Sequence, residues 1–303
     1  KALSAASENV IQEVKREIGS KEINEKKYNF FGEQHNPTTI SSLILKFLKE
    51  EIEKSTEKIH SAVITVPANF SKEAREATQK AADIAGIPVE YIINEPTAAA
   101  LNYAFQSGES LSGNYLIYDF GGGTFDCSIA NIKGQEVEIL SSEGVSKLGG
   151  KDFDEAIRKI VIKKYKDEYG KEFDEKLFDS NDAEDLKISL SRKEKINAQI
   201  GLDAIEVTRD EFLTETSSLI MQAELAVETA LQSANLKKDE INEVILVGGT
   251  SRIPAIQESI SKFFEKEPRL FGSPDEAVAL GAAVYAAYKA NPDALNQLQK
   301  KAI

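Results

Sequence analysis

One nine-residue stretch constrains the fold of this chain more than any other. Residues 118–126 read YDFGGGTFD: an apolar run ends in Asp119, three glycines turn the chain, and a second run carries Asp126. Consecutive glycines let backbone N–H groups approach a phosphate without obstruction by a Cβ atom. Carboxylates beside such a turn suit a hydrated Mg²⁺ ion, which prefers oxygen ligands. The stretch therefore indicates either a phosphate and metal site or a plain hairpin with a flexible turn.

Two further glycine pairs also lie next to predicted helices. In residues 244–254 (VILVGGTSRIP) an apolar strand leads into two glycines and then a helix, and residues 148–150 (LGG) precede another helix. Each pair alone also fits a tight turn, and neither matches the dinucleotide or P-loop glycine motif. Ligands of open α/β folds bind at the carboxyl ends of strands. One nucleotide between two α/β halves would therefore use all three glycine sites.

Composition excludes several classes of protein. A chain of 303 residues predicts about two domains. Its net charge of −13 disfavours general binding to nucleic acid. One cysteine, Cys127, and two histidines exclude an internal disulfide and a zinc site built from several Cys and His residues. No apolar run is long enough to span a membrane, so we expect a soluble protein of the cytoplasm or of an organelle matrix.

Strand and helix signals alternate along the chain and predict a mixed α/β fold. Apolar β-branched runs at 62–66 and 89–93 flank a helix that starts after Ser71 and ends at Gly86, which is typical of parallel strands. The runs at 115–119, 125–131 and 136–142 are separated by short turns and predict an antiparallel meander.

Further helices are predicted from apolar spacing and capping signals. Residues 10–18 show helical spacing up to Gly19, and residues 44–52 carry Ile44, Phe47, Leu48 and Ile52 on one face. The final helix is expected over 274–288, because Pro274 is a favourable first helical residue.

Six stretches together resemble a known family. They are residues 62–70 (AVITVPANF), 92–100 (IINEPTAAA), 119–126 (DFGGGTFD), 148–154 (LGGKDFD), 247–254 (VGGTSRIP) and 273–283 (SPDEAVALGAA). In order and spacing the chain resembles the nucleotide-binding domain of the seventy-kilodalton heat-shock chaperones of the DnaK type. The resemblance implies an α/β, actin-like ATPase fold. Two ribonuclease-H-like lobes, the first incomplete, would carry smaller inserted subdomains.

The resemblance also implies domain boundaries. A helical subdomain inserted in the first lobe would cover 1–60, and the remaining strands and helices of that lobe would cover 61–110. The second lobe would consist of 111–148 and 217–303. An inserted subdomain on the adenosine side would cover 149–216.

Residue roles follow from the same resemblance. The implied catalytic residues are Asp119, Asp126, Thr124 and Glu95, of which the three carboxylates would meet Mg²⁺ through water. The implied ligands of ATP or ADP are Gly121, Gly122, Gly123, Gly150, Glu184, Lys187, Ser191, Gly248, Gly249, Thr250, Arg252, Ile253 and Asp275. Pro96 resembles a switch between nucleotide states, and Pro67 and Arg75 resemble residues that couple the domain to its linker and to J-domain partners.

The chain departs from the family pattern at several places. The first phosphate loop, roughly GIDLGTT, and its neighbouring strands do not occur in the sequence, so we expect that they belong to a longer protein. Lys1 lies close to the place of the catalytic lysine, but its spacing to residues 16–19 is one residue short. Ile188 stands where many members have an arginine that stacks on adenine, and Asn69 replaces a more usual tyrosine.

The resemblance implies an ATPase that drives cycles of protein folding. A J-domain co-chaperone, a nucleotide-exchange factor and unfolded client peptides would be its partners, the clients through a domain beyond this sequence. One alternative is a nucleotide-binding co-chaperone or regulatory partner that does not hydrolyse ATP. Another is a sugar kinase or a filament-forming relative in the same superfamily.

Overall fold

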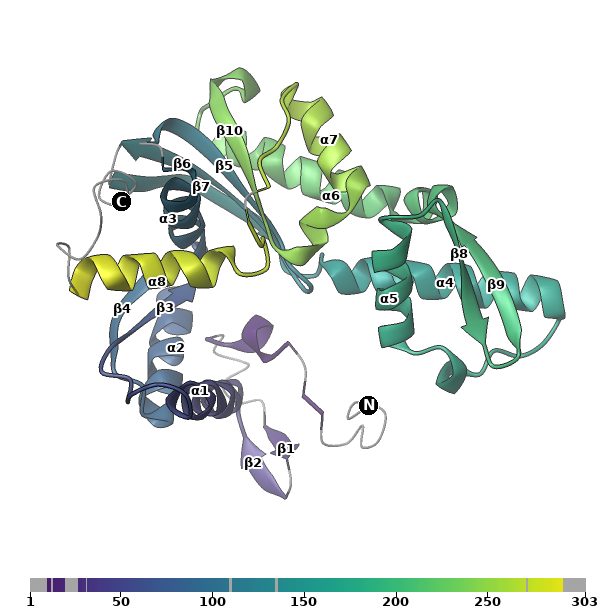
Figure 1. Cartoon of the computed structure of the whole chain (residues 1–303), viewed down its shortest axis with the longest axis horizontal. Helices are drawn as coiled ribbons and strands as arrows, with labels where there is room; N and C mark the ends of the chain where they lie inside the picture. Colours follow the sequence, from purple (N-terminus) through teal and green to yellow (C-terminus); the bar gives the residue numbers. More distant parts are fainter. Residues whose placement is uncertain are drawn as a thin grey trace.

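The computed structural model describes residues 10–11, 13–19, 27–30, 32–108, 111–133, 136–270 and 272–290. These residues form one four-stranded sheet and three two-stranded sheets. In Figure 1 the four-stranded sheet lies above a smaller α/β unit, and a third group of elements extends to the right. No helix in this part of the chain is long and apolar enough to cross a lipid bilayer.

The four-stranded sheet has the order β10-β5-β6-β7. Strands β5 (Ser112–Phe120), β6 (Phe125–Lys133) and β7 (Glu136–Val145) form the predicted antiparallel meander. Strand β10 (Ile241–Val247) pairs with β5 in parallel. The β5–β6 register sets Asp119 directly opposite Asp126, so the two carboxylate-bearing residues of the glycine-rich stretch face each other across the turn.

Both faces of this sheet are buried. Successive side chains of a strand point to opposite sides, and each side packs against its own group of helices. On one side Leu116 and Tyr118 belong to a core shared with α6 (Arg209–Ser233) and α7 (Pro254–Phe264). On the other side Tyr115 and Ile117 pack with the helix α3 (Glu95–Ser107). The continuous apolar runs in the sequence are therefore the signature of a sheet covered on both faces.

The smaller α/β unit contains the parallel pair β3 (Ala62–Val66) and β4 (Val89–Asn94). Helix α2 (Lys72–Ala85) connects them, with Ser71 as its N-cap and Gly86 in the left-handed conformation at its end. Helix α1 (Pro37–Glu53) packs beside α2, where Leu45 joins a small core that includes Ala82 and Ala85. The predicted strands, cap and glycine stop are confirmed here.

Helices α3 and α8 (Ala277–Ala290) lie between the four-stranded sheet and the β3–β4 pair (Figure 1). Tyr285 of α8 also stacks edge-to-face on Tyr91 of β4, with ring centroids 5.5 Å apart. The predicted start of α8 at Pro274 is wrong, since the helix begins at Ala277. The Pro274 carbonyl instead accepts a hydrogen bond from the Gly248 N–H at 3.0 Å, so tertiary contact holds this segment in a turn.

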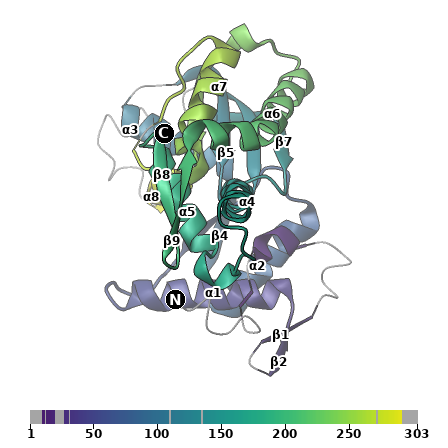
Figure 2. The same cartoon turned by 90° about the vertical axis from the view of Figure 1, so that its right-hand side faces the viewer.

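A third unit consists of α4 (Gly150–Tyr169), α5 (Ser180–Leu190) and the hairpin β8 (Lys195–Ile200) and β9 (Asp203–Thr208). Figure 2 looks along α4, which connects this unit to the glycine-rich end of the large sheet. Short 3₁₀ turns lie at η3 (Glu175–Leu177), η4 (Lys238–Glu240) and η5 (Gly249–Arg252).

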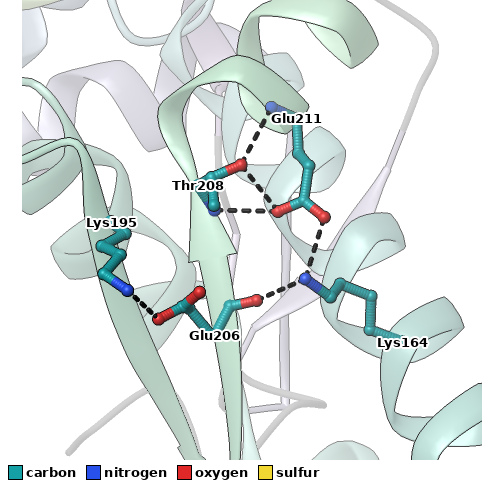
Figure 3. A network of polar contacts seen from close by, with 5 residues as sticks. All are labelled: Lys164, Lys195, Glu206, Thr208 and Glu211. Carbon is teal, nitrogen blue, oxygen red and sulfur yellow. Dashed lines mark hydrogen bonds and ion pairs between the residues drawn. The ribbon is translucent and has the colours of Figure 1, made fainter.

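A polar network joins α4 and the end of β9 to the start of α6 (Figure 3). Thr208 and Glu211 form a capping box at the start of α6, with the Thr208 N–H donating to the Glu211 carboxylate at 2.9 Å. Lys164 of α4 donates to that carboxylate at 2.8 Å and to the Glu206 carbonyl oxygen at 2.6 Å. The network thereby fixes the start of α6 against α4 and β9.

The predicted helix over residues 10–18 is wrong in the part that the structure describes. Only a 3₁₀ turn, η2 (Val14–Glu17), forms there, and Glu13 before it is left-handed with φ 59°. The Glu13 carboxylate pairs with Arg16 at 2.6 Å and with Lys151 of α4 at 2.9 Å, so contacts distant in sequence override local helical spacing. The hairpin β1 (Tyr28–Phe30) and β2 (Glu33–His35) follows.

The apolar face predicted for residues 44–52 lies on α1 but is open to solvent. Ile44, Phe47, Leu48 and Ile52 are all about half exposed, and Phe47 is 59% exposed. Amphipathic spacing identified the helix, whereas burial depends on which surfaces the rest of the fold brings to it.

Candidate functional site

Three glycine-rich turns meet at one end of the large sheet. The Gly150 and Lys151 N–H groups donate to the carbonyl oxygens of Gly121 and Gly122, at 3.1 and 3.0 Å. The Thr250 hydroxyl donates to the same Gly121 oxygen at 2.9 Å. A Cβ atom at Gly149 would lie 2.5 Å from the backbone of Gly123, so this approach requires glycine. The structure thus brings together three turns that are far apart in the sequence.

A cavity of about 1150 Å³ opens beside these turns, between α4, α5 and η5. Most of the predicted nucleotide-binding residues line it: Gly122, Gly150, Glu184, Lys187, Ser191, Gly249, Thr250, Arg252, Ile253 and Asp275. Ile188 lines it as well, as does Glu13 from the segment before η2. Gly121, Gly123 and Gly248 do not line it but lie in or against the same turns.

Two ion pairs shape the wall of this cavity. Lys187 is buried, contacts Asp154 at 2.7 Å and donates to the Gly150 carbonyl oxygen at 3.1 Å. Burial raises the pKa of Asp154, and the hydrogen bond from Lys187 opposes that rise. Arg252 is held by Asp275 at 2.9 Å and is half exposed. Both cations are therefore oriented before any ligand is bound.

Three carboxylates gather on the other side of the glycine turn. Burial first, and then the negative charges of Glu95 and Asp126, raise the pKa of Asp119 to about 7, while Lys15 opposes the rise. Burial and Glu95 also raise the pKa of Asp126. Hydrogen bonds from Thr124 and Asn69, together with the charge of Lys15, partly offset this rise. Like charges held this close favour a bound cation.

A lysine that the sequence analysis did not single out lies among these carboxylates. The Lys15 Nζ atom is 2.6 Å from Glu95 Oε1, and its charge reaches Asp119 and Asp126. Lys1, the residue considered from the sequence, lies outside the described residues. Lys15 directly precedes residues 16–19, the stretch from which the spacing of Lys1 was counted. That stretch was therefore the sequence signal that could have identified Lys15.

The segment around η2 also reaches the glycine turn. A Cβ atom at Gly123 would lie 3.0 Å from a guanidinium nitrogen of Arg16. Glu13 links Arg16 to Lys151 of α4, while Lys15 links the same segment to Glu95 at the start of α3. Residues 13–16 therefore bring positive charge to the place where the glycine turn and the carboxylates meet.

The donor set suits a hydrated metal ion more than a directly ligated one. Among the described residues no three His, Cys, Asp or Glu side chains are close enough to hold an ion together. Mg²⁺ usually keeps several of its waters, so carboxylates such as Asp119, Asp126 and Glu95 can hold it through that shell.

Comparison with known proteins decides the family. A family model described as "Hsp70 protein" matches residues 3–297. The chain belongs to the Hsp70 family. Its fold is therefore the actin-like ATPase fold of that family, and the chain corresponds to a DnaK-type nucleotide-binding chaperone domain.

Two relatives of this Hsp70 chain are named "Chaperone protein DnaK". The protein from Mycoplasma mycoides subsp. mycoides is 39% identical over 299 residues, which cover 94% of this chain and 50% of the relative. The protein from Mycoplasma mobile is 39% identical over 297 residues, which cover 92% of this chain and 48% of the relative. The Hsp70 chain thus spans about half the length of the curated relatives it matches.

Proposed function

We propose that this chain binds ATP or ADP together with Mg²⁺, hydrolyses ATP, and supplies the nucleotide-dependent step of a DnaK-type chaperone. The observation that carries the proposal is the convergence of three glycine turns between a large cavity and a cluster of carboxylates. The adenosine would occupy the cavity, and its phosphates would extend over the glycine turn toward the carboxylates.

Backbone groups and cations of the chain would bind the nucleotide. Glu184, Lys187 and Ser191 line the cavity from α5 and offer polar atoms for adenosine, and Arg252 faces them from η5. The N–H groups of the glycine turn, with the Thr124 hydroxyl, would donate to phosphate oxygens. Asp119, Asp126 and Glu95 would hold Mg²⁺ through its water shell, and the ion would neutralise charge on the transferred phosphoryl group.

Lys15 would stabilise negative charge that develops during hydrolysis. Its ammonium group lies at the carboxylates that would surround the terminal phosphate, and Glu95 holds it in place at 2.6 Å. A positioned ammonium group in such a site lowers the barrier more than one in water, because it need not reorient as charge develops. Lys15 thus replaces Lys1 in the proposed role.

Coupling to partners stays a prediction. Of the residues that resemble the coupling positions, Pro67 lines a small cavity with Glu95, Asp119 and Asp126. Arg75 donates a hydrogen bond to the Pro67 carbonyl oxygen at 3.4 Å. A J-domain co-chaperone, a nucleotide-exchange factor and client peptides would be the partners of the longer protein. The domain boundaries given above and a cytoplasmic location also remain predictions.

Calorimetric titration with ADP and Mg²⁺ tests the proposal. We expect saturable binding that Asp119→Ala weakens and Gly249→Trp abolishes, because a Cβ atom at Gly249 would already lie 2.5 Å from Asp275 Oδ1. Leu202→Ser, on the fully exposed β8–β9 turn, is the control and should bind like the unmodified protein. A folded protein that does not bind ADP would contradict the proposal.

The second candidate is a nucleotide-binding co-chaperone or regulator without hydrolysis. The carboxylate cluster, with Lys15 held by Glu95 at 2.6 Å, favours hydrolysis over this candidate. Single-turnover assays with labelled ATP separate the two. Binding without release of phosphate would favour the second candidate.

A further inference from the structure

Asn69, which follows strand β3 of the smaller α/β unit, contacts the carboxylate cluster of Asp119, Asp126 and Glu95. Its side-chain amide donates a hydrogen bond to Asp126 Oδ1 at 3.3 Å. Asn69 belongs to the turn that follows β3, whereas Asp126 lies on β6 of the four-stranded sheet. The bond therefore crosses between the two α/β units at the edge of the proposed metal site.

The turn that carries Asn69 is held firmly by one guanidinium group. Arg75 donates to the carbonyl oxygens of Phe70, Ala68 and Pro67, at 3.3, 3.2 and 3.4 Å. It also donates to the Asn94 side chain at the end of β4, at 2.7 Å. Asn69 is exposed and its own carbonyl oxygen is not among these acceptors, so its side chain projects from a turn whose backbone is fixed.

Asp126 is in turn confined by its surroundings. A Cβ atom at Gly144 of β7 would lie 2.5 Å from Asp126 Oδ1, so the strand beside it leaves that oxygen little room. A hydrogen bond from Thr124 adds a contact from the glycine turn. Asn69 is the partner in this arrangement that comes from the smaller α/β unit, so the orientation of the Asp126 carboxylate depends on how the smaller unit and the four-stranded sheet are placed relative to each other.

We propose that Asn69 is a positioning residue that orients Asp126 toward the water shell of the bound metal. The proposal rests on the proposed binding of nucleotide with Mg²⁺. It deepens that function by tying the metal site of the large sheet to the turn after β3. A change in the spacing of the two units would break the Asn69–Asp126 bond and loosen the metal without touching the nucleotide cavity.

The test compares ADP affinity with Mg²⁺ and with a chelator. Asn69→Ala should reduce the gain in affinity that Mg²⁺ provides by about 3- to 10-fold, which is the net contribution of one typical hydrogen bond. Affinity in the chelator and the melting temperature should stay unchanged. Asn69→Gln keeps the amide donor and should restore part of the gain. Asn197→Ala, on an exposed position of β8, is the control.

The outcomes separate this inference from the proposed function. If Mg²⁺ raises the ADP affinity of Asn69→Ala as much as that of the unmodified protein, the role of Asn69 is overturned and the proposed function stands. Equal loss of affinity with and without Mg²⁺ also overturns it, because a general structural role would act on both. An unmodified protein that binds no ADP overturns the proposed function, and the role of Asn69 with it.

Discussion

The backbone of Gly281 in α8 lies directly against the backbone of Ala98 in α3. A Cβ atom at position 281 would come within 1.8 Å of the Ala98 carbonyl oxygen. Two helices that cross this closely need a residue without a side chain at the crossing. Because α3 and α8 lie between the two sheets, this contact sets the spacing of the two α/β units.

Gly281→Ala should therefore push the two helices apart. We expect a loss of unfolding free energy of about 1–3 kcal/mol, the usual cost of forcing extra atoms into a packed contact. Chemical denaturation followed by circular dichroism measures it. Leu280→Ala, a neighbouring residue that is 41% exposed, should cost much less. Equal stability of the two variants would contradict the packing argument.

Lys15→Ala should remove hydrolysis and spare binding. The ammonium group lies at the carboxylate cluster and does not line the large cavity, so adenosine contacts remain. We expect the single-turnover rate with ATP to fall about 10²-fold or more, which is typical for loss of one charge-stabilising donor. The affinity for ADP should change little. Lys46→Ala, on the exposed part of α1, serves as the control. Normal hydrolysis of ATP by Lys15→Ala would exclude Lys15 from the reaction.

Asp119 should make the stability of the metal-free protein depend on pH. Its pKa is raised from 3.8 to about 7 in the folded protein, chiefly by burial, so folding favours the protonated acid. Its contribution is then fully present below about pH 4 and is lost as the pH rises toward 7.

Asp119→Asn removes this group's titration and mimics the neutral acid. With chelator present, the variant should match the unmodified protein near pH 4 and exceed its unfolding free energy by roughly 2–4 kcal/mol at pH 8. Urea denaturation across this range measures the difference. A difference that does not change with pH would show that Asp119 is not the group responsible.

Ile188→Arg should tighten nucleotide binding. Ile188 lines the cavity near Ser191 and is 46% exposed, so an arginine there would have room to lie on a purine ring. We expect the affinity for ADP to rise about 3- to 10-fold from stacking and cation–π attraction. Leu202→Arg adds the same charge at a remote turn. If Leu202→Arg gives an equal increase, net charge rather than stacking is the cause.

Much of the local architecture follows from the sequence alone. Apolar β-branched runs identified β3, β4 and β10, and turn residues identified the meander of β5, β6 and β7. Ser71 and Gly86 marked the ends of α2 because capping depends on residues within one turn of the helix. The glycine-rich stretches and the carboxylates beside them also stand out, since their chemistry is carried by neighbours in the chain.

Tertiary contacts decided the rest. The left-handed Glu13, the late start of α8 and the place of Lys15 among the carboxylates all depend on partners more than 20 positions away, such as Lys151, Gly248 and Glu95. The exposure of the apolar face of α1 likewise cannot be predicted from helical spacing, because the spacing shows where an apolar face lies but not what covers it. Sequence determines such features only through the assembled fold, because the energies of long-range contacts exceed the small local preferences of a few residues.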